Sequence, residues 1–183
     1  MAAVVSSLSY VPSALSLNSL LLVLCRRNQG LKLVPCVLMK SRVLNIRLEE
    51  SSFEILISGD FGVLSFLESI RKVGFCPGMI DYAKVINVLV KEKRGLDALD
   101  VLNQIKAARM KPDIVCYTMV LNGVIMEGEY DKADELFDEL LVLGLVPDVY
   151  TYNVYINGLC KQNNVKGGLD VLLLCGGMVK SEV

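Results

Sequence analysis

Apolar residues in the middle of the chain fall at helical spacing in two successive segments. In the first segment they are Tyr117, Val120, Leu121 and Val124, and in the second they are Ala133, Leu136, Phe137 and Leu140. The intervals i, i+3, i+4 and i+7 place each set on one face of an α-helix. We expect Asp131 to cap the second helix, and Gly144 to end it before Pro147. The pattern therefore predicts a helix, a turn near Gly128 and a second helix over residues 114–148.

The same pattern recurs at a constant step of 35 residues. Residues of three types keep this step: Pro77, Pro112 and Pro147; Tyr82, Tyr117 and Tyr152; and Asn87, Asn122 and Asn157. Two short helices cannot bury their apolar faces alone, whereas stacked copies bury them against one another. The sequence thus predicts an all-α fold, an α-α superhelix (solenoid) of 35-residue helix-turn-helix repeats. The regular repeats are 79–113, 114–148 and 149–183, the last with a glycine-rich, degenerate second half.

The repeats become less regular toward the N-terminus. We interpret residues 14–48 as an early degenerate repeat, whose second helix, around residues 30–39, should be kinked by Pro35. Residues 49–78 are predicted to be a shortened repeat, either because its first helix has only about two turns or because residues 58–61 form a tight loop. Residues 1–13 are rich in serine and lack acids, and they form an N-terminal tail or a transit-like segment.

Composition excludes several classes of function. The chain has no histidine and no Cys-x-x-Cys pair among its six cysteines, so a zinc cluster is not expected, and we expect buried, reduced thiols. No catalytic set and no glycine-rich phosphate loop is visible, which predicts no enzyme activity, no metal and no cofactor. The net charge is −1, so strong nonspecific binding to nucleic acid is not supported, and a polyanion would have to be held by local geometry. The apolar run over residues 15–25 is interrupted by Ser and Asn and does not indicate a membrane partner.

Four sequence motifs at fixed spacing resemble a known repeat. They are Ala-Asp-Glu-Leu-Phe at 133–137, Gly-Leu-Val-Pro-Asp at 144–148, Val-Tyr-Thr-Tyr-Asn at 149–153 and Ile-Asn-Gly-Leu-Cys-Lys at 156–161. Together with the 35-residue period, they closely resemble the P-type pentatricopeptide repeat of plant organelle RNA-binding proteins. The related tetratricopeptide repeat has a period of about 34 residues and a Trp-Leu-Gly motif, and this chain has no Trp. The resemblance is strong over residues 77–161.

The resemblance implies that each repeat binds one base of single-stranded RNA. In this family the base is read by the residue after the repeated Tyr together with the last residue of the repeat. The positions that correspond are Ala83 with Asp113, Thr118 with Asp148, and Asn153 with Val183, while Asn18 has the reading position of the early repeat without an assignable partner. Thr with Asp resembles a guanine reader, and Asn with Asp resembles a uracil reader.

Two further sets of positions follow from the resemblance. The residues expected to pack on base faces are Ile80, Val115 and Tyr150, and those expected to contact phosphate at the end of the first helix are Arg26, Lys91 and Lys161. We expect the repeated tyrosines to be core residues rather than base-stacking platforms. The acids of residues 131–139 are interpreted either as a solvated face or as the outer face of an RNA-binding groove.

The resulting hypothesis is sequence-selective binding of single-stranded organellar RNA, in RNA processing, stability or translation, in the mitochondrion or alternatively in the chloroplast. A second hypothesis is a protein-interaction scaffold that uses the same groove or the apolar C-terminal end at residues 172–174. A third is a truncated product without a function of its own, because the second repeat is shortened and the last one is degenerate.

Overall fold

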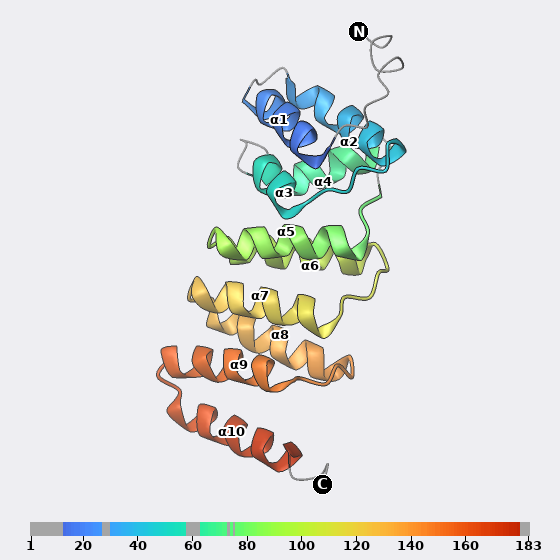
Figure 1. Ribbon diagram of the computed structural model, residues 1–183. Helices are drawn as coiled ribbons and strands as arrows, with labels where there is room; N and C mark the ends of the chain where they lie inside the picture. Colours follow the sequence, from blue (N-terminus) through green and yellow to red (C-terminus); the bar gives the residue numbers. More distant parts are fainter. Residues whose placement is uncertain (1–12, 27–29, 58–62, 73, 75, 180–183) are drawn as a thin grey trace, which may run out of the picture. The chain divides into compact units, whose positions relative to one another are not determined.

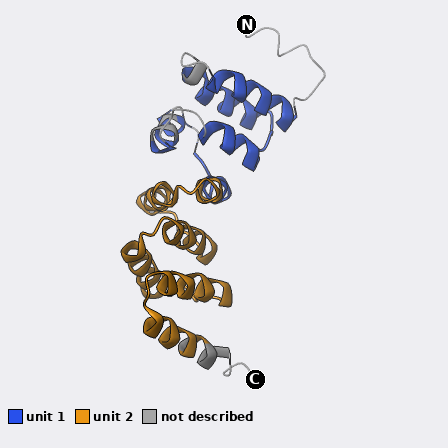
Figure 2. Cartoon of the chain, turned by 90° about the vertical axis from the view of Figure 1, so that its left-hand side faces the viewer, with its two compact units in different colours: residues 1–85 blue, residues 86–183 orange. Residues whose placement is uncertain are grey.

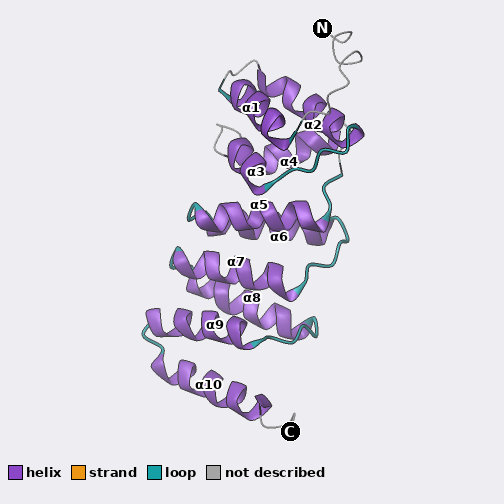
Figure 3. Ribbon diagram, in the orientation of Figure 1, coloured by secondary structure: helices purple, strands orange, loops and turns teal. Residues whose placement is uncertain are grey.

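A computed structural model describes residues 13–26, 30–57, 63–72, 74 and 76–179. Over these residues the chain forms helices, turns and loops and no strand (Figure 3). The helices are α1 (Ala14–Cys25), the 3₁₀ helix η1 (Gly30–Leu33), α2 (Val34–Val43), α3 (Glu50–Ile57), α4 (Val63–Lys72), α5 (Met79–Lys91), α6 (Gly95–Ala107), α7 (Ile114–Met126), α8 (Tyr130–Val142), α9 (Val149–Lys161) and α10 (Val165–Val179). None of the helices in these ranges combines the length and the apolar character needed to span a bilayer.

The chain divides into two compact units, Met1–Val85 and Ile86–Val183, and the boundary falls within α5 (Figure 2). In the first unit, α1 packs on α3 and α2 packs on α4. In the second unit, α7 packs on α6, α8 and α9, and α9 packs on α8 and α10 (Figure 1). Within each unit the first helix of one hairpin therefore contacts the first helix of the next, as stacked repeats require.

The 35-residue period of the sequence is also a period of the backbone. Helices α5, α7 and α9 are each 13 residues long, and they begin 35 residues apart, at Met79, Ile114 and Val149. Residues with left-handed backbone recur at the same step, at Lys93, Gly128 and Asn163 after the first helices and at Gly74, Arg109 and Gly144 after the second. A left-handed residue that ends each helix is the common way to reverse the chain. Three of these six turns have a glycine at the left-handed position, and the other three have a lysine, an arginine or an asparagine there.

The predicted apolar faces form the core. Tyr82, Tyr117 and Tyr152 are at most 6% exposed, which confirms that the repeated tyrosines are core residues. The Tyr117 hydroxyl donates to Glu139 at 3.0 Å within the same hairpin. In the second unit the Phe137 ring stacks on Tyr155 of the following hairpin, with centroids 3.9 Å apart. Aromatic residues therefore join α8 to α9 across the repeat boundary.

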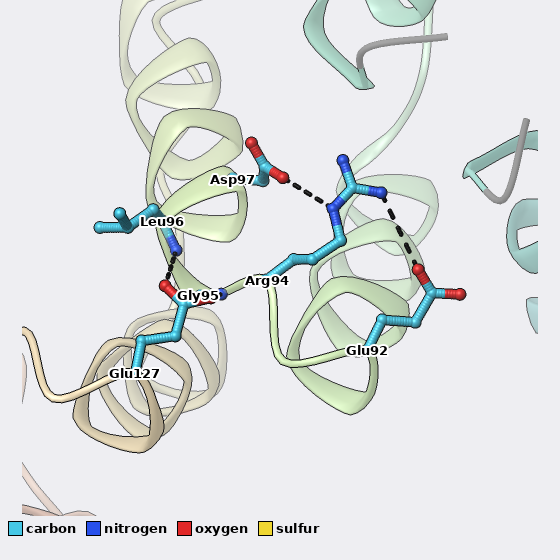
Figure 4. A network of polar contacts seen from close by, with 6 residues as sticks. All are labelled: Glu92, Arg94, Gly95, Leu96, Asp97 and Glu127. Carbon is cyan, nitrogen blue, oxygen red and sulfur yellow. Dashed lines mark hydrogen bonds and ion pairs between the residues drawn. The ribbon is translucent and has the colours of Figure 1, made fainter. Parts of the chain in front are cut away.

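A close backbone contact and a carboxylate join α6 to α7. A Cβ atom added to Gly95 would lie 2.3 Å from the carbonyl carbon and oxygen of Gly123, so the two helices can approach this closely only without it. Glu127, at the end of α7, accepts hydrogen bonds from the backbone N–H of Gly95 at 2.6 Å and of Leu96 at 2.9 Å (Figure 4). Arg94 stands at the N-cap of α6 without a side-chain capping bond. The carboxylate that caps α6 thus comes from the next hairpin.

Three local predictions need correction or can now be decided. Helix α8 begins at Tyr130 with Glu129 at its N-cap, so Asp131 lies in the first turn and the prediction that it caps the helix was wrong. Pro35 lies in the first turn of α2, where a missing N–H is tolerated, and the predicted second helix is divided just before it into the 3₁₀ helix η1 and α2. Helix α3 has only 8 residues, as the shortened repeat predicts. The alternative, a tight loop at 58–61, lies outside the described residues.

The cysteines are only partly buried. The structure describes all six as free thiols, as the sequence predicts. Cys116 is buried, Cys25 and Cys175 are half-buried, and Cys36, Cys76 and Cys160 are exposed, so the expectation of buried thiols was wrong for three of them. These three positions do not belong to the apolar stripes, and the stripe pattern therefore gives the better guide to burial.

Candidate nucleic-acid interface

The junction between the hairpins of α7 and α9 contains a chain of three polar side chains. The Thr118 hydroxyl lies 2.8 Å from the Thr151 hydroxyl, and the Thr151 hydroxyl donates to Oδ1 of Asp148 at 2.7 Å. The Thr118 hydroxyl has one proton, which it can donate either to Thr151 or to the carbonyl oxygen of Ile114, also at 2.8 Å. The two residues that the resemblance pairs as base readers, Thr118 and Asp148, are thus connected through Thr151.

Asp148 has a structural role at this junction as well. It is the N-cap of α9, where its side chain accepts the backbone N–H of Thr151 at 2.8 Å. Hydrogen bonds from the backbone and the side chain of Thr151 lower the pKa of the Asp148 carboxyl below its ordinary value. Asp148 is therefore ionised at neutral pH and can accept a hydrogen bond from a ligand, because its side chain remains exposed.

The same residues line a small pocket of about 80 Å³, bounded by Ile114, Val115, Thr118, Met119, Asp148 and Tyr150. Thr118 is 4% exposed, whereas Val115 is 57% and Tyr150 is 63% exposed. Exposed apolar side chains next to a polar floor can cover the faces of a planar ring while its edge reaches the polar atoms. The structure thus brings together the predicted base-reading pair of this repeat and the base-packing residues of two successive repeats.

The first unit repeats part of this arrangement. Asn18 is buried, its Nδ2 donates to the Ser51 hydroxyl at 2.9 Å, and its Oδ1 accepts from the Ser52 hydroxyl at 2.6 Å. Helix α3 begins at Glu50, so Ser52 has the same place in α3 that Thr151 has in α9, and Glu49 has the place of Asp148. By this register Glu49 has the position of the partner that the sequence did not assign to Asn18, and a base-reading role for the pair remains a prediction. One extra residue before α3 had obscured this register.

The remaining predicted reading positions are more open or incomplete. Ala83 is half-buried and offers no polar atom, and Asn153 is exposed. Asp113 is the N-cap of α7 and accepts the backbone N–H of Cys116 at 2.9 Å. Burial and the neighbouring Asp113 carboxylate raise the pKa of the Cys116 thiol to about 12. Val183 lies outside the described residues, so the pair of Asn153 is not placed.

Thr151 and Ser52 are functional candidates that the sequence analysis did not select. Each is the third residue of a first helix and is 0% exposed. The available signal was the Thr within Val-Tyr-Thr-Tyr-Asn, which stands next to the repeated Tyr. It could be interpreted only after the structure had shown that its hydroxyl points back to the preceding hairpin.

The predicted base-packing and phosphate positions are accessible. Ile80 is 74% exposed, in line with Val115 and Tyr150. Arg26 is the C-cap of α1, and Lys91 and Lys161 are the last residues of α5 and α9; all three are exposed. These cations therefore lie at the end of the first helices, where the resemblance expects phosphate, and that role remains a prediction.

The acids of α8 are not simply a solvated face. Glu139 accepts two hydrogen bonds from Lys106, at 2.8 and 3.0 Å, besides the one from Tyr117. Asp134 accepts the hydroxyl of Tyr155 at 2.9 Å. These two carboxylates join α8 to its neighbours, so only the exposed Asp131, Glu135 and Asp138 fit the interpretation as a solvated face. Within the described ranges, no group of three or more acidic or cysteine side chains could hold a metal ion.

Comparisons with known proteins identify the repeat. A sequence model of the PPR (pentatricopeptide repeat) repeat family matches residues 112–161, and a model of the single PPR repeat matches residues 150–174. A mitochondrial pentatricopeptide repeat-containing protein of Arabidopsis thaliana is 46% identical over an alignment of 134 residues, which covers 50% of this chain and 30% of that protein. The chain thus spans less than a third of the length of this relative.

Solved structures agree on the fold. The pentatricopeptide repeat protein PPR10 in complex with an 18-nucleotide psaJ RNA element has a TM-score of 0.56 at 23% identity, over 98% of this chain and 27% of PPR10. The PPR domain of Arabidopsis thaliana protein-only RNase P 1 in complex with tRNA has a TM-score of 0.55 at 17% identity, over 86% of each chain. The chain is therefore an all-α helical-repeat protein of the solenoid class. By sequence, residues 112–174 consist of repeats that match the pentatricopeptide repeat family.

Proposed function

We propose that this chain binds single-stranded RNA and selects a base at the junction of α7 and α9. The observation that carries the proposal is the pocket in which Thr118 and Asp148 lie together with Val115 and Tyr150. A hydroxyl and a carboxylate present both donor and acceptor capacity to a base edge. By the family resemblance, Thr with Asp selects guanine, whose Watson–Crick edge can donate to the carboxylate and accept from a hydroxyl.

The process and the compartment are part of the proposal. The Arabidopsis relative is a mitochondrial protein, which supports the mitochondrion over the chloroplast as the place of action. RNA processing, stability or translation in that organelle is the class of process in which such binding would serve. We propose that this chain acts by binding RNA and not by catalysis, since the Thr151 hydroxyl at the reading junction is buried and the Asp148 carboxylate serves as the N-cap of α9.

Binding by this chain alone should be weak. Stacking of a base on protein contributes about 1–3 kcal/mol per base, and ordering of the RNA opposes it. Among the residues that the structure describes, the junction of α7 and α9 is the one where both readers predicted from the sequence are placed and polar. The test therefore uses high protein concentrations and compares RNA sequences with one another.

The experiment measures fluorescence anisotropy with four RNA oligomers that differ in one central base. Wild-type protein is expected to prefer guanine at that base. Thr118→Val should abolish the preference, and Lys161→Glu should weaken all four complexes equally, because a phosphate contact carries no sequence information. Lys132→Glu, on the second helix α8, is the matched charge control. Equal binding of all oligomers by all variants would remove the proposal.

Exposed leucines favour a second candidate function, a protein-interaction scaffold. Leu172 is 52% and Leu173 is 74% exposed on α10. Leu172 occupies the position in its repeat that Phe137 occupies in the preceding repeat. The rings of Tyr152 and Tyr155 on α9 contact Phe137. A protein partner could cover this face of α10 instead. If this is the function, Leu173→Lys would abolish association with the partner and leave RNA binding unchanged.

A further inference from the structure

The first unit contains a cavity of about 620 Å³ that no reading position accounts for. Its walls come from the end of α2, the loop that follows α2, and the first turn of α5. This volume lies within the range of pockets that hold small organic ligands. It is far larger than the pocket of about 80 Å³ beside Thr118. A whole nucleotide, and not only the edge of a base, can therefore be accommodated.

The cavity is lined by more cations than anions. Arg42, Arg47 and Lys84 line it together with one acid, Asp81. The Asp81 carboxylate accepts the backbone N–H of Gly78 at 3.0 Å, so it is held at the start of α5. Charged hydrogen-bond donors around a cavity favour an anionic ligand, and phosphate most of all where arginine is present.

Gly78 explains why this junction differs from the next two. It ends its repeat directly before α5, as Asp113 and Asp148 end theirs directly before α7 and α9. Glycine supplies no carboxylate at the reading position, so the junction lacks a base-reading acid, and Asp81 is the one acid among the residues that line the cavity, against three cations. Glycine at this position thus removes the base-reading acid and makes the site more suitable for an anion.

Two of the cations are held in place by backbone carbonyls. Arg42 donates from Nη1 to the carbonyl oxygen of Cys76 at 3.2 Å, and Lys84 donates from Nζ to the carbonyl oxygen of Leu48. A guanidinium has five N–H donors and an ammonium has three, so one hydrogen bond to a carbonyl does not use all the donors of either group. Arg47 is exposed. The exposed Ile80 lines the cavity as well and can cover the face of a base or a sugar.

We propose that this cavity binds the phosphate of a nucleotide and does not select its base. In the RNA complex the ligand is one nucleotide of the bound strand, and this part of the inference rests on the proposed function. The cavity, lined by residues within 41–48 and 78–84, would then hold a nucleotide by charge, whereas the repeat at residues 114–148 reads one. The same chemistry also recognises a free nucleotide, which makes the cavity testable without RNA.

The first experiment follows backbone amide shifts by NMR while AMP, CMP, GMP, UMP, adenosine or inorganic phosphate is added to the full chain. All four nucleotides are expected to change the amide chemical shifts of residues 41–48 and 78–84 to the same extent. Adenosine, which has no phosphate, should leave them unchanged. Arg47→Gln should weaken nucleotide binding about tenfold, and Lys72→Gln, an exposed lysine outside the cavity, should not. Equal shifts with adenosine and AMP, selectivity for one base, or no shift at all would each overturn the proposal.

The second experiment measures the salt dependence of RNA binding. Loss of one phosphate contact lowers the slope of log K against log salt by about 0.7 for single strands. Arg47→Gln is expected to lower this slope by the same amount and to leave the base preference at the Thr118 pocket unchanged. If Thr118→Val abolishes the base preference while Arg47→Gln changes neither slope nor nucleotide binding, the cavity proposal alone fails. If nucleotides bind the cavity but no RNA is discriminated, the base-reading function fails and the cavity proposal stands.

Discussion

The side-chain hydroxyls of Thr118 and Thr151 lie 2.8 Å apart, although the two residues belong to successive hairpins. The first unit contains the corresponding contact, from the Ser52 hydroxyl to Asn18 at 2.6 Å. In both junctions the third residue of one first helix contacts the fifth residue of the preceding first helix. We infer that the third residue orients the predicted base reader, and that it is a positioning residue rather than a reader.

The first prediction concerns Thr151→Val, which removes the hydroxyl between Thr118 and Asp148. Loss of this buried hydrogen bond should lower the free energy of unfolding by about 1 kcal/mol at neutral pH. The pKa of Asp148 should rise toward its ordinary value of 3.8, while the backbone bond from residue 151 keeps it below that value. Carbon-detected NMR titration of the Asp148 carboxyl measures this shift. Thr151→Ser retains the hydroxyl and should retain the low pKa.

The pH dependence follows from the direction of that shift. The pKa of Asp148 is lower in the folded than in the unfolded chain, so its ionised carboxylate stabilises the fold above the unfolded value. This contribution is lost as the pH falls through the folded value. The stability difference between wild type and Thr151→Val should therefore shrink under acid conditions. A constant difference from neutral to acid pH would show that Thr151 does not act through Asp148.

The second prediction concerns the carboxylate that caps α6 from the next hairpin. Glu127→Gln removes the negative charge and one of the two acceptors used by the N–H groups of Gly95 and Leu96. Because a charged acceptor stabilises a helix N-terminus, we expect a loss of about 1 kcal/mol in the free energy of unfolding. Urea denaturation measures it. Glu135→Gln, on the exposed side of α8, should change stability much less, and equal effects would refute the capping role.

The third prediction concerns the contact between Gly95 and Gly123. A Cβ atom at residue 95 would lie 2.3 Å from backbone atoms of Gly123, so Gly95→Ala must push α6 and α7 apart. We expect a loss of about 1–3 kcal/mol, seen as a lower urea midpoint. Gly168→Ala is the control, because its Cβ would lie 3.6 Å from the nearest atom, at ordinary contact distance. It should be neutral or slightly stabilising, because alanine favours helices.

The fourth prediction concerns thiol reactivity. Cys116 is buried and its pKa is raised to about 12, so it remains protonated and inaccessible at pH 8. Exposed Cys36, Cys76 and Cys160 should react with iodoacetamide in the native protein, and Cys116 only after addition of denaturant. Peptide mass spectrometry identifies the alkylated residues. Alkylation of Cys116 in the native protein at the rate of Cys160 would show that α7 does not pack as described.

The sequence predicted the parts of the fold that depend on periodic patterns. The stripes around Tyr117 and Phe137 predicted the helices and their buried faces. The short distance between Phe53 and Tyr82 predicted a shortened repeat, with a short first helix, as found in α3, as one of two alternatives. The pattern could not predict that Glu127 caps a helix of the preceding hairpin, because the two segments are 31 and 32 residues apart in sequence. Such contacts depend on how hairpins stack, which periodicity alone does not specify.

The candidate site was predicted in position but not in its hydrogen bonding. Thr118 and Asp148 were paired by resemblance, and the structure places them at one pocket. Thr151 was missed, since its side-chain direction depends on the close contact of α7 with α9. The partner of Asn18 could not be assigned, because Phe53 and Glu54 fall one residue out of step in the sequence and only the helix bounds show where α3 begins.

The most direct test of the central claim replaces the predicted base-reading residue of one repeat and measures which base is then preferred. Thr118→Asn retains Asp148 and, by the family resemblance, should change the preferred base from guanine to uracil. Anisotropy titrations with oligomers that carry G or U at the central position compare the two proteins under one salt condition. We expect the ratio of the two dissociation constants to invert between wild type and Thr118→Asn. If both proteins prefer the same base, or neither distinguishes the two, the pocket at Thr118 and Asp148 does not read RNA.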